Sequence, residues 1–387
     1  VAFGPANIGP AIDAADHARL TGAGKPVMMS RAQSYSTWIN RFERLNVVGA
    51  IEHESEGGLH VALDVLYARL ANDREEYALA AAGTNGLTAD VTGTQRLESV
   101  TIARDSITAA TFSGIDFRSE SKRTVDHTRF GQAVLSLAAP LGAATTLSAR
   151  AGYARSDFQE PVFDKVFLQA RNKPFRYTAT GTAPGNSYGF DATDAAQWTL
   201  MRADTREDAI VNQNVTARLE ITQALAPGAA VKLGAAYRFF GNDGYERRVR
   251  VDYPGGSGTA AVTRLFGGRT LAPYVVADVD ATFAATGQNR VLTSADDMPG
   301  TSYAVHEDSY AAFALATLDG VLGALPVQAE MGLQYQRVGT LSSGKASTDV
   351  RQYLISRRSH RHAWLPSFQA RAALRPDLLL RLAASRN

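Results

Sequence analysis

The sequence predicts an all-β protein: an antiparallel transmembrane β-barrel, present in part as about ten membrane strands with long extracellular loops. Three observations lead to this expectation. Apolar and polar residues alternate in paired runs, tight turns join the two runs of each pair, and long polar segments separate one pair from the next. Short turns that alternate with long loops are typical of outer-membrane barrels, whose strands raise no peak of hydropathy.

The composition removes several other classes. The chain has 387 residues, 45% of them hydrophobic, and a formal net charge of +2, so no strongly basic surface for nucleic acid is expected. It contains no cysteine, which excludes disulfides, thiolate metal sites and cysteine nucleophiles. No run approaches the roughly 18 apolar residues of a membrane helix. Residues 1–20 lack the basic start and apolar core of a signal peptide.

The clearest hairpin covers residues 211–240. Its first run, VNQNVTARLEIT, alternates so strictly that Val215, Ala217, Leu219 and Ile221 share one face while polar side chains occupy the other. A turn at 226–228 (Ala-Pro-Gly) follows, and a second alternating run, AVKLGAAYRFF, leads away from it. Two such runs around a Pro-Gly turn predict a β-hairpin.

Four further hairpins repeat this unit around tight turns at 56–58, 140–142, 320–323 and 375–377. The segments between hairpins, 73–127, 158–210, 243–305 and 340–361, are polar and rich in glycine. Because loops longer than about 15 residues are uncommon in compact soluble domains, we expect these segments to be extracellular loops of a barrel. Residues 1–40 are expected to be an entry loop, and residues 41–387 the partial barrel domain.

Four tyrosines stand at equivalent places in the hairpins. Tyr67, Tyr153, Tyr237 and Tyr335 each end the apolar row of an outgoing strand. Aromatic side chains at one height would form a girdle at a membrane interface. The alternative is that β-strands simply favour aromatic residues.

The closing stretch, WLPSFQARAALRPDLLLRLAASRN (364–387), resembles the late-barrel signature of TonB-dependent outer-membrane receptors. Residues 41–52, 61–77, 151–161 and 307–338 are similar to other barrel segments of that family. The resemblance implies that the chain is a middle portion of the barrel, without the N-terminal plug and the last strands. It also implies a place in the bacterial cell outer membrane, in contact with its lipid.

The activity that the resemblance implies is active uptake of a scarce small-molecule ligand, powered through the plug by the TonB–ExbB–ExbD complex. Such a transport cycle involves no covalent chemistry on the ligand, so we expect neither an enzyme nor a cofactor. A carbohydrate or oligosaccharide is the favoured ligand and an iron–siderophore complex the second. Two other readings stay open: a soluble or secreted β-rich protein acting on polysaccharide, and a passive porin-like barrel.

Aromatic and arginine side chains of the expected loops are the candidate ligand-binding residues, because aromatic faces suit sugar rings and arginine suits carboxylates. These candidates are Tyr177, Tyr188, Trp198 and Arg202 in segment 158–210, and Tyr245, Arg247, Tyr253 and Arg269 in segment 243–305. The alternative is that they pack the loops against themselves.

No metal site is predicted. His360 and His362 would share a face of a strand, but no third ligand stands nearby, so a solvated strand is favoured. The stretch GNDGYE (241–246) lacks the complete pattern of a calcium loop and is expected to be a turn at the top of a strand. The sequence has no G-x-S-x-G nucleophile elbow.

Overall fold

The computed structural model describes residues 3–23, 25, 27–30, 32–87, 94–179, 185–254, 262–268, 270, 272–323, 325–348, 351–375 and 377–386. Its strands are β1 (Ser34–Glu54), β2 (His60–Ala80), β3 (Arg96–Ala103), β4 (Ser106–Pro140), β5 (Thr145–Thr178), β6 (Gly185–Tyr188), β7 (Thr199–Ala226), β8 (Ala229–Asp252), β9 (Thr263–Phe266), β10 (Tyr274–Ala277), β11 (Tyr303–Leu322), β12 (Leu325–Thr348), β13 (Arg351–Arg375) and β14 (Leu378–Ser385). Its α-helices are α1 (Ala14–Leu20) and α2 (Val279–Thr286). Short 3-10 turns cover Pro5–Asn7, Ala82–Leu87, Ala195–Gln197 and Ser294–Asp296.

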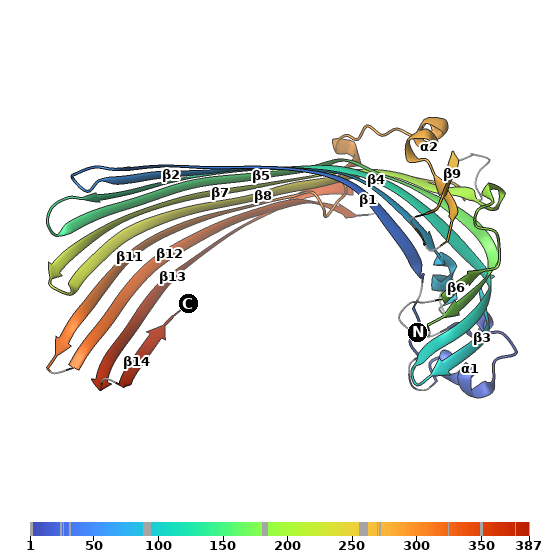
Figure 1. The fold of residues 1–387 in the computed structure, drawn as a ribbon, viewed down its shortest axis with the longest axis horizontal. Helices are drawn as coiled ribbons and strands as arrows, with labels where there is room; N and C mark the ends of the chain where they lie inside the picture. The colour runs from blue at the N-terminus through green and yellow to red at the C-terminus, as the bar shows by residue number, and fades with distance from the viewer. Residues whose placement is uncertain are drawn as a thin grey trace.

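One antiparallel sheet of 12 strands dominates the structure, in the order β1-β2-β4-β5-β7-β8-β11-β12-β13-β14, with β3 beside β4 and β6 beside β5. Figure 1 shows it as a long arch, with the tight turns at one end and α1, β3 and β6 at the other. The expectation of an all-β antiparallel sheet is confirmed. The sheet is not closed into a barrel, because β1 and β14 lie at opposite ends of the strand order. No helix among the described residues is long and apolar enough to cross a membrane.

The five predicted hairpins are present as β1–β2, β4–β5, β7–β8, β11–β12 and β13–β14. At the β7–β8 turn, Gly228 has a φ of 76°, a conformation that glycine adopts without strain. The backbone N–H of Asp319 donates to the carbonyl oxygen of Gly228 at 2.6 Å. A Cβ added to Gly228 would lie 1.8 Å from the carbonyl oxygen of Asp319, so this turn requires glycine where it meets the next hairpin.

The prediction that the long polar segments are loops is wrong for most of 73–127, 158–210 and 340–361, whereas most described residues of 243–305 lie outside strands. β2 continues to Ala80, β5 to Thr178 and β8 to Asp252, so the expected turn at 241–246 lies within a strand. The expected loop 340–361 is strand except at residues 349 and 350, which are outside the described part. The physical reason is that charged side chains paired across strands stabilise a sheet without strict apolar and polar alternation.

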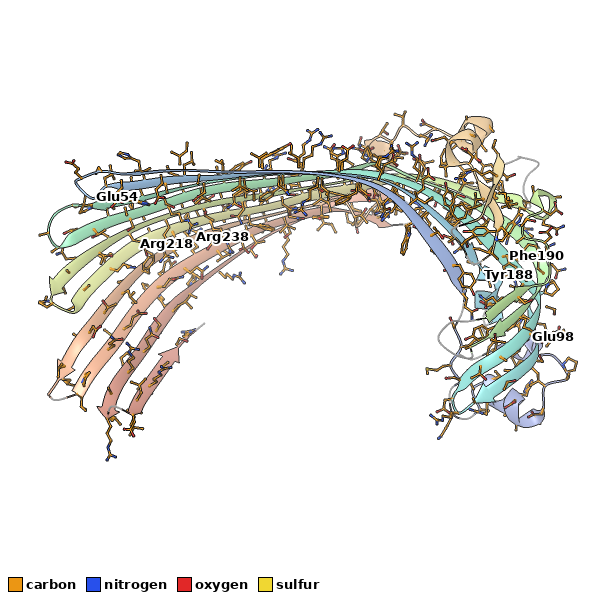
Figure 2. The ribbon with its side chains drawn as sticks, viewed as in Figure 1. Glu54, Glu98, Tyr188, Phe190, Arg218 and Arg238 are labelled. Carbon is orange, nitrogen blue, oxygen red and sulfur yellow. The ribbon has the colours of Figure 1, made fainter. Side chains whose placement is uncertain are left out.

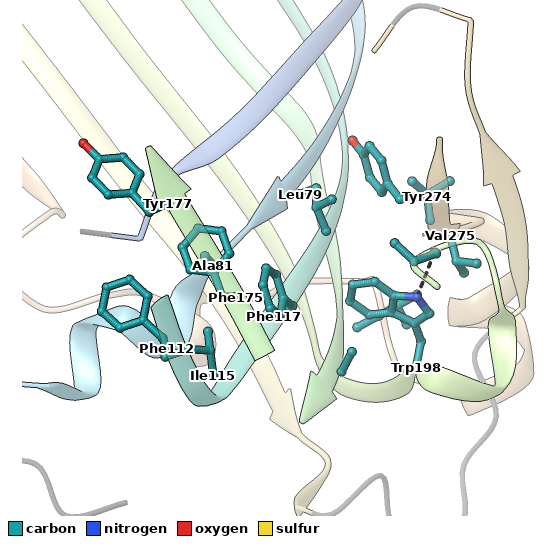
Figure 3. Packing of buried hydrophobic residues seen from close by; sticks show 14 of the residues in the cluster. Leu79, Ala81, Phe112, Ile115, Phe117, Phe175, Tyr177, Trp198, Tyr274 and Val275 are labelled. Atoms are coloured by element: carbon teal, nitrogen blue, oxygen red, sulfur yellow. Dashed lines mark hydrogen bonds between the residues drawn. The ribbon is translucent and has the colours of Figure 1, made fainter. Parts of the chain in front are cut away.

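A local core covers one face of the sheet at the end far from the tight turns. The segment with β9, β10 and α2 docks on β4, where the hydroxyl of Ser119 donates to the carbonyl oxygen of Val275 at 2.7 Å. The backbone N–H of Ala277 in turn donates to the hydroxyl of Ser121 at 3.0 Å. Figure 3 shows the aromatic and aliphatic side chains of this core, among them Phe117, Phe175 and Trp198. The N-terminal segment joins it through the buried side chains of Phe3, Leu20 and Val27.

Candidate functional site

The sheet has two chemically different faces. We call the face that carries Tyr67, Tyr153, Tyr237 and Tyr335 the outer face, and the opposite face, which carries Arg218 and Arg238, the inner face. Directly opposed residues of an antiparallel pair project to the same side, so the register of each strand pair extends this assignment from strand to strand. Figure 2 places Arg218 and Arg238 in the half of the sheet that carries the tight turns, and Tyr188 and Phe190 near the other end.

The predicted tyrosines form a regular row on the outer face. Tyr67 is opposite Gly131, and Tyr153 is opposite Ala133, so the row moves two residues along β4 between its neighbours. The same two-residue step occurs on β7, between Val215 and Ala217, and on β11, between Tyr310 and Ala312. Tyr310 and Trp364 also belong to this aromatic row, through their pairing with Tyr237 and Tyr335. The row therefore shifts by two residues for every two strands that it crosses, an average of one residue per strand. Such a constant shift is the stagger expected of strands that are tilted within the sheet.

Large apolar side chains between the aromatic row and the tight turns are exposed. We call this surface the apolar band; its exposed members include Val47, Ile51, Val65, Leu135, Leu219, Ile221, Leu233, Leu318, Met331, Leu333, Leu380 and Leu382. Met331 is 63% exposed and Ile51 71% exposed. A shallow apolar hollow of about 750 Å³ lies beside the row, lined by Tyr237, Tyr310 and several alanines. Such an extended apolar surface marks contact with another protein or with a membrane.

The inner face beyond the aromatic row carries a network of paired charges, which we call the charge ladder. Its ion pairs cross several strands: Lys122 with Glu76 at 2.8 Å and with Glu120 at 3.1 Å, Arg248 with Asp204 at 2.8 Å, and Arg206 with Asp208 at 2.6 Å and Glu246 at 3.2 Å. Its members come together because β2, β4, β5, β7 and β8 are consecutive neighbours there, although the register shifts between β4 and β5 and between β5 and β7. The result is a polar surface with both signs of charge.

Asp204 is the most buried carboxylate of the charge ladder, with 1% of its side chain exposed. Its Oδ2 accepts a hydrogen bond from Arg248 and lies 3.3 Å from Nε of Arg202, while its Oδ1 has no hydrogen-bond partner. The guanidinium of Arg202 stacks 4.0 Å from the ring centroid of Phe167. Burial lowers the pKa of Arg202, although the charge of Asp204 opposes that shift.

Lys165 stands opposite Asp204 and is half-buried. Its ammonium lies 3.7 Å from the ring centroid of Phe163. Burial, followed by the charge of Arg206, lowers the pKa of Lys165. The charges around Asp204 are therefore unevenly balanced, with cations in excess.

Two carboxylates approach each other on the same face. Glu160 is opposite Asp208 across β5 and β7. Burial, followed by the charge of Asp208, raises the pKa of Glu160 to about 7, while Arg206 opposes the rise. Among the described residues no group of three or more potential ligands could hold a metal ion. His360 and His362, which the sequence analysis considered as metal ligands, are exposed on β13.

The candidate residues named from the sequence do not come together in one place. Tyr177 and Trp198 are buried in the local core, where Nε1 of Trp198 donates to the carbonyl oxygen of Ala192 at 3.1 Å. Tyr188 packs edge-on against Phe117, and Tyr253 lies against the same core. These four positions fit the packing alternative that the sequence left open.

The other candidates are polar and more accessible. Arg202 belongs to the charge ladder. Tyr245 donates its hydroxyl to Glu207 at 2.7 Å and lies under the guanidinium of Arg247, which pairs with Asp297 at 2.9 Å. Arg269 lies outside the described residues.

Sequence reasoning missed most of the charge ladder. The missed residues include Glu76, Lys122, Lys165, Asp204, Arg206 and Arg248. The signal that could have revealed it is charge at every second position, as in Asp204-x-Arg206-x-Asp208, which places all three side chains on one face of a strand. Neither a protein-family model nor a curated protein matches this chain.

Proposed function

We propose that this chain forms part of the wall of a transmembrane antiparallel β-barrel in the bacterial outer membrane. The single observation that carries the proposal is the exposed apolar band, bounded on one side by the aromatic row and backed by the charged inner face. Hydrocarbon would cover the band, water the inner face, and aromatic rings the interface between them.

The geometry of the row supports this proposal. A stagger of one residue per strand, with a rise of about 3.3 Å per residue and about 4.8 Å between strands, corresponds to a tilt of about 35°. That value is within the usual range for strands of membrane barrels. An aromatic row at a constant height is expected if it marks an interface, and it has no evident use on a face that is wet throughout.

The proposed role of this wall is in a receptor of the TonB-dependent kind, which the closing motif at 364–387 resembles. In that role the TonB–ExbB–ExbD complex would power uptake through a plug, and the inner face would line the path of the ligand. A carbohydrate remains the favoured ligand and an iron–siderophore complex the second. The charge ladder could bind either class, because it offers both hydrogen-bond donors and acceptors. A soluble polysaccharide-acting protein and a passive porin-like barrel are the competing proposals.

Because the chain has no cysteine, single introduced cysteines would test the proposal cleanly. Leu333 and Gln334 are adjacent on β12 and project to opposite faces. An environment-sensitive fluorophore on Leu333→Cys should be quenched by brominated lipid, while the same label on Gln334→Cys should be quenched by aqueous iodide. The proposal fails if the full-length protein is recovered without detergent, or if both labels report water.

A matched experiment separates the receptor from the porin-like alternative. Uptake of a labelled oligosaccharide by cells should stop when the proton-motive force is collapsed, if TonB powers it. Diffusion through a passive barrel would continue unchanged.

A further inference from the structure

A polar hollow of about 290 Å³ lies on β1, β2 and β4, on the side of the aromatic row that is away from the tight turns. Its lining includes three arginines, Arg41, Arg69 and Arg129, and an equal number of carboxylates, Glu43, Asp73 and Asp126. Asp73 also lies 3.9 Å from Arg123, and Asp126 accepts a hydrogen bond from Asn72.

Arg69 and Arg129 stand directly opposite each other across β2 and β4. Both are exposed, and no ion pair of either within 4.0 Å is found among the described residues. Asp157 stands opposite Arg129 on β5, but its carboxylate is bound by Arg155 at 2.7 Å. Like charges directly opposed in a sheet destabilise it, and an anion held between them would offset that cost. Arg206 and Arg248 are also opposed, but each of those pairs with a carboxylate.

The height of this hollow indicates what the anion is. Arg69 is two residues beyond Tyr67 of the aromatic row, and Arg129 is two residues beyond Gly131, which pairs with Tyr67. Two residues along a strand span about 7 Å. If the aromatic row marks the interface, both guanidinium groups are at the level of the lipid headgroups. The exposed side chain of Leu45 is directly opposite Arg69, and that of Val47, opposite Tyr67, lies on the side of the tight turns.

We propose that the hollow lined by Arg41, Arg69 and Arg129 binds the phosphate group of a membrane lipid whose acyl chains lie on the apolar band. The inference rests on the proposed membrane location and adds the partner for this part of the outer face. Arginine suits the phosphate because its planar group donates two parallel hydrogen bonds, and two opposed arginines can hold one phosphate between them. The acyl chains meanwhile cover apolar side chains that are exposed among the residues described by the structure.

The test uses full-length protein purified from membranes in neutral detergent, with phosphatidic acid as the probe and phosphatidylcholine as the uncharged comparison. Native mass spectrometry counts the lipid retained. The double variant Arg69→Gln/Arg129→Gln should lose affinity for phosphatidic acid by about 30-fold, since each arginine at a membrane surface contributes to anionic lipid binding. Arg69→Lys/Arg129→Lys should retain an intermediate affinity, because lysine keeps the charge but loses the pair of parallel hydrogen bonds.

Arg371→Gln/Arg381→Gln is the matched control. Arg371 and Arg381 form the same kind of opposed, exposed pair, but on the inner face near the tight turns. This control should bind phosphatidic acid like the unaltered protein. Equal retention by both double variants would overturn the proposal. If inorganic phosphate alone binds as tightly and displaces the lipid, the hollow is a site for a free anion and the lipid assignment is wrong.

A second measurement covers the case in which the glutamine variant does not fold. In the unaltered protein, raising the salt concentration from 0.1 M to 1 M should release phosphatidic acid but not phosphatidylcholine, because salt screens exposed charges. Salt-insensitive retention would contradict the inference. If the labels on Leu333→Cys and Gln334→Cys both report water, the membrane location is wrong. If the label on Leu333→Cys reports lipid but Arg69→Gln/Arg129→Gln binds phosphatidic acid unchanged, only the phosphate site is wrong.

Discussion

Tyr335 on β12 and Trp364 on β13 face each other directly across the sheet, with ring centroids 4.9 Å apart. Trp364 is 55% exposed, so the pair lies at the surface of the aromatic row. A double-mutant cycle with Tyr335→Leu and Trp364→Leu should give a coupling of about 1 kcal/mol, the usual worth of an aromatic pair beyond its buried area. Thermal unfolding in detergent measures it. Strictly additive effects would show that the rings do not stabilise each other.

The burial of Asp204 predicts a large effect of its removal. Asp204→Ala leaves Arg202 and Arg248 without their shared carboxylate, and breaking a buried ion pair costs about 3–5 kcal/mol of unfolding free energy. Denaturant unfolding monitored by tryptophan fluorescence checks this. Asp252→Ala is the control, because Asp252 is 51% exposed in its pair with Arg250 and its loss should lower the free energy of unfolding far less. Equal losses in both variants would contradict the structure.

Glu160 predicts a pH dependence of stability. It lies seven residues beyond Tyr153, outside the apolar band, and its pKa in the folded protein is about 7 because of burial and the charges of Asp208 and Asp126. The folded state therefore binds the proton more tightly than the unfolded chain. Protonation of Glu160 therefore contributes to the free energy of unfolding at pH 4, and this contribution is lost as the pH rises through 7. Because the carboxyl of Glu160 is only partly buried, solvent screening limits this contribution to the free energy of unfolding to about 1 kcal/mol.

Glu160→Gln should therefore raise the melting temperature at pH 8 and leave it unchanged at pH 4. The charge of Arg206 opposes the rise in the pKa of Glu160, so Glu160→Gln should be tested with Arg206 left unchanged. A stabilisation of equal size at both pH values would indicate a cause other than titration of this carboxyl.

Replacement of Trp198 distinguishes a role in core packing from a role in ligand binding. Trp198→Ala should lower the free energy of unfolding by about 3–5 kcal/mol, because the side chain is 7% exposed within the local core. Trp38→Ala, at a position that is 62% exposed, should cost far less. If Trp198→Ala instead leaves stability unchanged and abolishes ligand uptake, the ligand-binding role expected from the sequence is the correct one.

Most of the sheet could be read from the residues themselves. The five turns contain Gly or Pro, and the flanking runs alternate every second residue, so local chemistry specifies these hairpins. The extensions of β4 and β5 could not be read in the same way. Their residues there are polar, as at Glu120 and Lys122, and such residues favour a strand only when a neighbouring strand supplies partners.

The candidate site was predicted less well, for the same reason. Aromatic residues in a polar segment suit a ligand or a core equally, and only the tertiary packing of the local core buries Trp198 and Tyr177. Lys165, Asp204 and Arg248 lie far apart in sequence but on neighbouring strands of the charge ladder.

The sequence by itself determined the antiparallel hairpins, the two unlike faces and the placement of the tyrosines, because each follows from spacing within a few residues. Only the tertiary structure decided that the polar segments are strands, that the tyrosines step evenly into one row, and that Arg69 meets Arg129. Those facts depend on the register between strands. Register joins residues far apart in the chain, and a shift of one residue would reverse the face of every side chain in a strand.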